Sequence, residues 1–196
     1  MVFEDKETLN YMNLDIMQER LASMLKPKRF RHSINTMQTA VALAKHYKVD
    51  IEKAAIAGLL HDCAKNLSDE DLLVCCNKYG IAVSELEKRQ PFLLHGAVGA
   101  VIAKNEFYVD DCEILKAIMC HTTGCVNMCT LDKIIFLADY IEPAREHKEA
   151  EAARKLVYED IDKAMLFTYD SVIKYVISKN GLIHPNTIEA RNELLM

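Results

Sequence analysis

The stretch Lys53-Ala-Ala-Ile-Ala-Gly-Leu-Leu-His61-Asp62 places a histidine and an aspartate directly after an apolar run of helical character. Asp50, just before this run, is suited to cap a helix that ends at His61-Asp62, because its side chain can accept a hydrogen bond from a backbone N–H. An imidazole and a carboxylate beside a buried helix are costly unless they are paired or bind a metal ion. The pair therefore needs partners from other parts of the sequence.

Four further residues at the ends of helical runs are candidates for these partners. His32 lies near the start of a helix, and His95 opens a helix rich in small residues. His121 falls on the buried face of its helix, and Asp139 follows the apolar run Ile-Ile-Phe-Leu-Ala. A single histidine such as His32 is, taken alone, also compatible with a capping or surface role. Together, these nitrogen and oxygen ligands predict a hydrolytic metal centre inside a helical bundle.

The rest of the chain also shows apolar residues at helical spacing, separated by capping signals. We expect the first helix between Thr8 and Leu25 and the end of the last long helix at Asn180-Gly181. The expected caps lie at the starts of four further helices, at Ser68, Ser84, Thr130 and Asp160. No stretch of the sequence shows convincing strand periodicity, so the expected fold class is all-α.

Composition favours one soluble domain over residues 1–196, with its core at about 20–190. Hydrophobic residues make up 51% and charged residues 27% of the 196, and the net charge of -5 gives no basic footprint for nucleic acid or a membrane surface. No apolar run reaches the roughly 18 to 20 residues of a membrane span. The seven cysteines are odd in number, and no secretory signal is seen, so free thiols and a cytoplasmic location are expected.

The residue types define the chemistry that the centre can carry. Two imidazoles and two carboxylates, from His32, His61, Asp62 and Asp139, suit iron, manganese or zinc. Such an ion can polarise a phosphoryl oxygen and lower the pKa of water. His95 and His121 are expected to supply a second metal site or to hold a phosphate as cationic donors. Arg29 and Arg145 add the guanidinium geometry that phosphate favours.

The order His32, His61-Asp62, Asp139 resembles the H…HD…D pattern of HD-domain phosphohydrolases. Further stretches are similar to the YqeK family, bacterial HD-domain hydrolases that cleave diadenosine tetraphosphate symmetrically into two ADP. The similar stretches are Arg29-Phe-Arg-His32-Ser, Ala57-Gly-Leu-Leu-His-Asp-Cys-Ala-Lys65, Leu94-His-Gly-Ala-Val-Gly-Ala100, His121-Thr-Thr-Gly124 and Ala138-Asp-Tyr-Ile-Glu-Pro-Ala-Arg145. The likeness covers roughly residues 20 to 190 and implies a single HD-domain helical bundle.

The resemblance also implies a role for each matching residue. His32, His61, Asp62 and Asp139 would bind iron, or alternatively manganese or another divalent transition metal, and Asp62, His95 and His121 would be catalytic. The substrate, a dinucleoside polyphosphate or an ADP-like nucleotide, would contact Arg29, Asp62, His95, His121, Thr122, Asp139, Arg145, Asn180, Gly181, Leu182, Ile183 and His184. The implied reaction is in-line attack of an activated water at the middle of the phosphate bridge.

Some alternatives and one departure accompany this interpretation. Cys125 follows His121-Thr-Thr-Gly124 where the family often has an arginine, so that contact to phosphate is missing here. Cys120, Cys125 and Cys129 with His121 form an alternative zinc site, although their gaps do not match the usual spacing. The metal core is equally compatible with an HD nucleotidase or phosphatase on another nucleotide, or with a nucleotide-binding sensor of weak activity. Apolar surface on the terminal helices suggests a homodimer.

Overall fold

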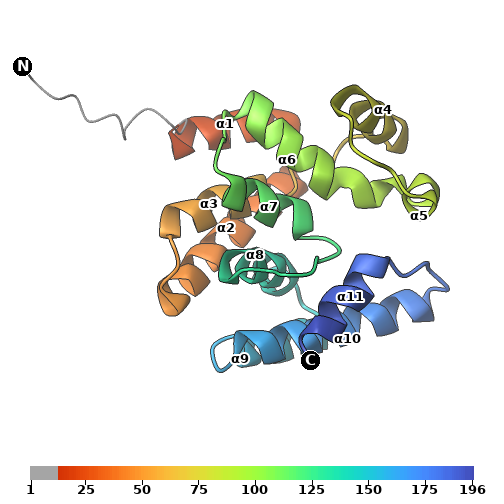
Figure 1. Cartoon of the computed structure of the whole chain (residues 1–196). Coiled ribbons are helices and arrows are strands. Elements are labelled where there is room, and N and C mark those ends of the chain that lie inside the picture. Colours follow the sequence, from red (N-terminus) through yellow and green to blue (C-terminus); the bar gives the residue numbers. More distant parts are fainter. Residues whose placement is uncertain (1–12) are drawn as a thin grey trace, which may run out of the picture.

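The computed structural model describes residues 13–196, which form eleven α-helices and one 3₁₀ turn and contain no β-strand (Figure 1). This confirms the all-α prediction. The elements are α1 (Leu14–Met24), α2 (Pro27–Tyr47), α3 (Ile51–Leu60), α4 (Asp69–Tyr79), α5 (Glu85–Arg89), η1 (Pro91–Leu94), α6 (His95–Glu106), α7 (Cys112–Cys120), α8 (Thr130–Ile141), α9 (Lys148–Leu156), α10 (Ile161–Ser178) and α11 (Pro185–Glu193). None of the helices in this range combines the length and apolar character that a membrane span requires.

The centre of the molecule is a group of four helices, α2, α3, α7 and α8, that pack on one another. Helix α3 is their hub, because every residue from Ala54 to Leu60 is buried. In Figure 1, α9, α10 and α11 lie at one end of this group, and α4, α5 and α6 lie at the other. One hydrophobic cluster runs through the whole, from Met17 in α1 to Ala190 in α11.

The contact between α2 and α3 depends on a glycine. A Cβ atom on Gly58 would lie 2.9 Å from the Cα atom of Met37 in α2, so only glycine allows the two backbones to approach this closely. Gly58 is one turn before His61, and Met37 is little more than one turn after His32. The same close contact therefore brings these two histidines together.

The predicted helix caps were largely correct. Side chains of Asp50, Ser68, Ser84 and Asp160 each accept a backbone N–H at the start of their helix. The cap predicted at Thr130 was wrong, because Cys129 is the capping position and Thr130 is the first helical residue. The backbone N–H of Cys129 donates to Asp132, which completes the start of α8. Of the predicted helix from Thr8, residues 8–12 lie outside the described residues.

Candidate active site and metal centre

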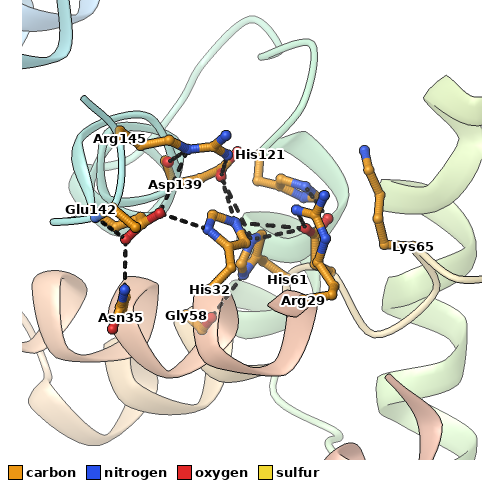
Figure 2. Close-up of polar contacts among 12 residues, drawn as sticks. Arg29, His32, Asn35, Gly58, His61, Lys65, His121, Asp139, Glu142 and Arg145 are labelled. Atoms are coloured by element: carbon orange, nitrogen blue, oxygen red, sulfur yellow. Dashed lines mark hydrogen bonds and ion pairs between the residues drawn. The ribbon is translucent and has the colours of Figure 1, made fainter. Parts of the chain in front are cut away.

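Three helices bring four side chains to one point. His32 comes from the first part of α2, His61 and Asp62 follow α3, and Asp139 lies near the end of α8 (Figure 2). His32 Nε2 is 3.2 Å from His61 Nε2 and 2.9 Å from Asp139 Oδ1. Asp62 Oδ2 is 3.7 Å from His32 Nε2 and 3.5 Å from His61 Nε2. The structure thus gathers the four predicted ligands in one cluster.

The second nitrogen of each imidazole determines which atom faces the cluster. His61 Nδ1 lies 2.8 Å from the carbonyl oxygen of Gly58, and His32 Nδ1 lies 3.1 Å from a carboxylate oxygen of Glu142. The carbonyl of Gly58 can only accept, so His61 Nδ1 carries the proton and His61 Nε2 presents a lone pair. His32 has a carboxylate at each ring nitrogen, Glu142 at Nδ1 and Asp139 at Nε2. The Nε2 atoms of the two histidines are 3.2 Å apart, next to two carboxylates, and both could act as ligands of a cation placed between them.

The spacing of three donor atoms, from His32, His61 and Asp139, fits a metal ion. Donors bound at about 2.1 Å lie about 3.0 Å apart at right angles and about 3.4 Å apart at the tetrahedral angle. The corresponding distances here run from 2.9 Å, between His32 Nε2 and Asp139 Oδ1, to 3.8 Å, between His61 Nε2 and the same oxygen. These three donors therefore fit a transition-metal ion in chemistry and in spacing, and Asp62 forms a second group of such spacing with His61 and His121.

Burial and mutual charge set the protonation of the centre. Burial lowers the pKa of His61 to about 4, so this imidazole is neutral at pH 7. Burial alone would raise the pKa of Asp62 and of Asp139. Interaction with the imidazole of His61, and then with those of His121 and His95, outweighs this effect at Asp62, and the interaction with His32 does so at Asp139. Both pKa values fall below the usual range, and both groups are carboxylates.

Asp62 also links the first cluster to a second one. Its other oxygen, Oδ1, lies 3.3 Å from His95 Nε2 and 3.6 Å from His121 Nε2, and these two nitrogens are 3.1 Å apart. The hydroxyl of Thr122 is 2.9 Å from His95 Nε2 and 3.0 Å from His121 Nε2. Lys65 Nζ approaches the same His95 nitrogen at 3.1 Å. One carboxylate thus faces both pairs of histidines.

The histidines at the ends of α3, η1 and α7 each make the same type of local hydrogen bond. His61, His95 and His121 each direct Nδ1 to the carbonyl oxygen three residues earlier, at 2.8, 2.5 and 2.6 Å. The acceptors are Gly58, Phe92 and Ile118. In each histidine, the backbone carbonyl one turn earlier therefore fixes the tautomer, with the proton on Nδ1.

Two arginines partly neutralise the carboxylates, and Figure 2 shows Arg145 beside Asp139 and Arg29 on the His61 side of the cluster. Arg29 Nη1 donates to Asp62 Oδ2 at 2.6 Å, and Arg145 Nη2 donates to Asp139 Oδ1 at 2.7 Å. Arg154 in α9 holds the segment that carries Arg145 by donating to three carbonyl oxygens. These belong to Ile141, Glu142 and Arg145, at 2.7, 2.8 and 2.6 Å.

The comparisons with known proteins agree with this geometry. Residues 29–144, which contain all four clustered ligands, match the HD domain family. The chain belongs to this family. Relatives from Halalkalibacterium halodurans, Bacillus subtilis and Staphylococcus aureus, each named symmetrical bis(5'-nucleosyl)-tetraphosphatase, are 36%, 33% and 32% identical to it. The matches cover 88%, 87% and 92% of this chain and 91%, 91% and 94% of the relatives. The expected membership of the YqeK family of HD-domain hydrolases is confirmed.

A solved structure supports the same assignment of fold. It is the crystal structure of a protein from Clostridium acetobutylicum described as a predicted HD superfamily hydrolase involved in NAD metabolism. The sequences are 46% identical, the TM-score is 0.92, and the match covers 94% of this chain and 98% of the other. The prediction of an HD-domain helical bundle is therefore confirmed.

Two cavities open beside the metal centre of this HD domain, and both include Arg145 in their walls. The larger, of about 880 Å³, is lined by Asp139 and by aromatic residues of α8, α10 and the start of α9, and we call it the tyrosine cleft. Its aromatic side chains are Tyr140, His147, Phe167 and Tyr175. The smaller, of about 610 Å³, includes His32, and we call it the basic cleft. Its cationic side chains are Lys26, Lys28, Arg29, Arg31, Lys65 and Arg145.

Some predicted residues are not in contact with the HD-domain centre. Asn180 and Gly181 lie just beyond the end of α10 and donate their backbone N–H groups back to its last turn, and His184 caps α11 and faces Glu87 at 3.6 Å. Their role as nucleotide contacts, like that of Leu182 and Ile183, stays a prediction. Cys125 is half-buried and lines a separate cavity. Among residues 13–196, the two groups suited to hold a metal contain only histidine and aspartate, so the alternative zinc site on cysteines gains no support.

Other site residues were missed by sequence reasoning. Glu142 is buried and accepts from His32, from Asn35 at 2.8 Å and from the backbone N–H of Ala144 at 2.7 Å. It lies within the run Ala-Asp-Tyr-Ile-Glu-Pro, in which only Asp139 was assigned as a ligand. Lys65, one turn beyond Asp62, was likewise part of a quoted motif without a role. Their position in these motifs was the available signal.

Proposed function

We propose that the chain hydrolyses diadenosine tetraphosphate symmetrically, releasing two ADP, at the centre formed by His32, His61, Asp62 and Asp139. The observation that carries the proposal is the convergence of the imidazoles of His32 and His61 with the carboxylates of Asp62 and Asp139. The names of the three relatives supply the substrate. The enzyme class is a metal-dependent hydrolase acting on phosphorus-containing anhydrides.

The four clustered side chains would hold a divalent transition-metal ion, with iron as our proposal and manganese as the alternative. When bound, such an ion supplies Lewis acidity toward a phosphoryl oxygen and lowers the pKa of water. Arg29 pairs with Asp62 and Arg145 pairs with Asp139, so their guanidinium groups lie beside the centre and can offset charge that develops on the phosphoryl oxygens. Asp62 is placed to orient the attacking water, because one of its oxygens faces each cluster.

His95, in the cluster with His121 and Thr122, is not suited to bind phosphate as a cation. Burial lowers the pKa of His95, and its Nδ1 proton is donated to the carbonyl of Phe92. At neutral pH its Nε2 therefore offers a lone pair, which can take up a proton or bind a second metal ion with His121 and Thr122. Lys65 is the cation that this side of the centre presents to phosphate.

The tyrosine cleft is the proposed site for one adenosine. Base-sized apolar surface is offered by Tyr140, Phe167 and Tyr175, while Asp139 and Arg145 connect the cleft to the metal centre. Ser178, the last residue of α10, also lines the cleft. The segment Asn180 to His184 follows directly, and we propose that it closes the outer end of this nucleoside site.

The test is to incubate iron-loaded protein with diadenosine tetraphosphate and to separate the products by chromatography. ADP as the sole nucleotide product supports the proposal. AMP with ATP rejects it, and binding without turnover indicates the nucleotide sensor. Preferential turnover of another nucleotide indicates an HD nucleotidase. A homodimer, a cytoplasmic location and the lack of nucleic-acid and membrane partners stay predictions.

A further inference from the structure

The basic cleft concentrates positive charge in a chain that is negative overall. Six cationic side chains line it, whereas the chain has a net charge of -5. The cleft contains one carboxylate, Glu142, which is buried and already accepts from His32, Asn35 and Ala144. Like charges gathered in this way repel one another unless an anion lies between them.

Three of the six cations are available to a ligand. Arg29 is engaged with Asp62, Arg145 with Asp139, and Lys65 with His95. Lys26, Lys28 and Arg31 are exposed, and their side chains make no ion pair within residues 13–196. Helix α2 also has no acidic residue in its first turn, so its positive end adds to the field instead of being neutralised.

The spacing along α2 connects these cations to the metal centre. Lys28, Arg31, His32 and Asn35 stand at positions i, i+3, i+4 and i+7, which form one stripe on a helix. The same stripe carries the proposed metal ligand His32 and reaches Glu142 through Asn35. A chain of phosphates bound at the metal centre would therefore continue along this stripe toward Lys28 and Arg31.

The two clefts differ in chemistry and meet at the centre. The tyrosine cleft includes Asp139, and the basic cleft includes His32, whose Nε2 is 2.9 Å from Asp139 Oδ1. Arg145 lines both. A substrate that is cut in its middle needs a site for each half, on either side of the reacting phosphorus. The aromatic cleft suits a nucleoside, and the cationic cleft suits phosphates.

We propose that the basic cleft binds the second nucleoside diphosphate half of the substrate through its phosphates, with Lys28 and Arg31 as the residues that contact them. This inference rests on the proposed function, and it assigns to the basic cleft the half of the substrate that the tyrosine cleft does not bind. Recognition there is by charge and not by the base. The two residues therefore favour substrates with phosphates beyond the bond that is cleaved.

The test compares the double variant Lys28→Ala/Arg31→Ala with the matched control Lys45→Ala/Lys104→Ala, which removes the same charge from exposed positions outside both clefts. We expect the KM for diadenosine tetraphosphate to rise at least tenfold in the first variant, with kcat changed less than twofold, because two charge-assisted contacts to the bound substrate are lost. The control should keep both constants. The conservative variant Lys28→Arg/Arg31→Lys should restore a KM near that of the wild type.

Equal KM values in the double variant and the control would overturn the inference. A loss of kcat with unchanged KM would also overturn it. Equilibrium binding of intact diadenosine tetraphosphate to metal-free protein tests the basic cleft without relying on hydrolysis. If the wild type binds it tenfold more tightly than the double variant but does not release ADP, the proposed function fails and the basic cleft stands as a phosphate site.

Discussion

At the scale of single residues, the proposed metal ligands could be picked out from the sequence, whereas the residues that hold them in place could not. His61, Asp62 and Asp139 stand out because polar groups at the ends of apolar helices need partners, which is a property of the local sequence. Glu142 supports His32 across 110 positions of the chain. A contact between residues so far apart follows from helix packing, and no local pattern encodes it.

Removal of one ligand is expected to remove the metal. Asp139→Ala leaves two imidazoles and one carboxylate in the cluster, and affinity for structural and catalytic ions depends on the complete ligand set. Elemental analysis of the purified variant should show metal reduced to trace amounts. The control is Asp110→Ala, at an exposed loop position. Undiminished metal in Asp139→Ala would contradict the assignment of the ligands.

Glu142→Gln tests the support of His32. The carboxylate accepts from three donors, and a glutamine oxygen with its amide group cannot replace all of these acceptor positions. Loss of such support typically weakens metal binding about 10- to 100-fold. Competition with a chelator measures this change. Glu146→Gln, at an exposed position next to Arg145, should leave the affinity unchanged. Equal affinities of the two variants would count against the role of Glu142.

At the scale of helices, capping residues in the sequence predicted where helices begin. The angles between helices depend instead on close contacts between their backbones. Asp50, Ser68 and Ser84 were recognised as caps because a cap acts on the turn that follows it. Cys129 was missed, because cysteine is not among the usual capping residues and the adjacent Thr130 is. The angle between helices depends on which small residues face a neighbouring backbone, and such contacts are fixed only in three dimensions.

The approach of α6 to α7 yields a prediction about two glycines. A Cβ on Gly96 would lie 2.7 Å from the carbonyl oxygen of Met119, whereas a Cβ on Gly99 would meet its neighbours at 3.5 Å, an ordinary contact distance. Gly96→Ala is therefore expected to lower the free energy of unfolding by about 1–3 kcal/mol. Gly99→Ala should leave it unchanged or raise it by up to about 1 kcal/mol. Urea unfolding measures both, and equal losses would contradict the described packing.

At the scale of the whole molecule, the fold class and the order of elements followed from sequence periodicity. The two clefts did not, because each is built from segments that are distant in sequence. The prediction of one domain over residues 1–196 stays a prediction, and the continuous core from Met17 to Ala190 supports it. The core also contains the ionisable groups of the centre, which makes the stability of the whole dependent on pH.

The free energy of unfolding of the metal-free protein should fall as the pH is lowered from 6.5 to about 4. In the unfolded chain His61 binds a proton below pH 6.5, whereas in the fold burial lowers its pKa to about 4. The unfolded state thus holds more protons in this window, so stability rises with pH there, by up to about 3 kcal/mol from His61 alone. Burial lowers the pKa of His95 as well, which adds to the slope.

Urea unfolding at several pH values between 7.5 and 4.5 measures this dependence. The variant His61→Asn has no titratable group at this position and should show a shallower dependence than the wild type. A free energy of unfolding that is constant across the window would contradict the prediction. So would identical slopes for the wild type and His61→Asn.

Three histidines of this centre are oriented by a hydrogen bond to the carbonyl three residues earlier, so each can be transferred to another protein together with its own short segment. A segment such as Gly58 to His61 includes both donor and acceptor, so its ring keeps its orientation wherever that turn is placed. The same holds for Phe92 to His95 and for Ile118 to His121. His32 is different, because its acceptor Glu142 comes from a distant segment. A designer who transplants this centre to another scaffold can move three histidines with one turn each, but must rebuild two segments for the fourth.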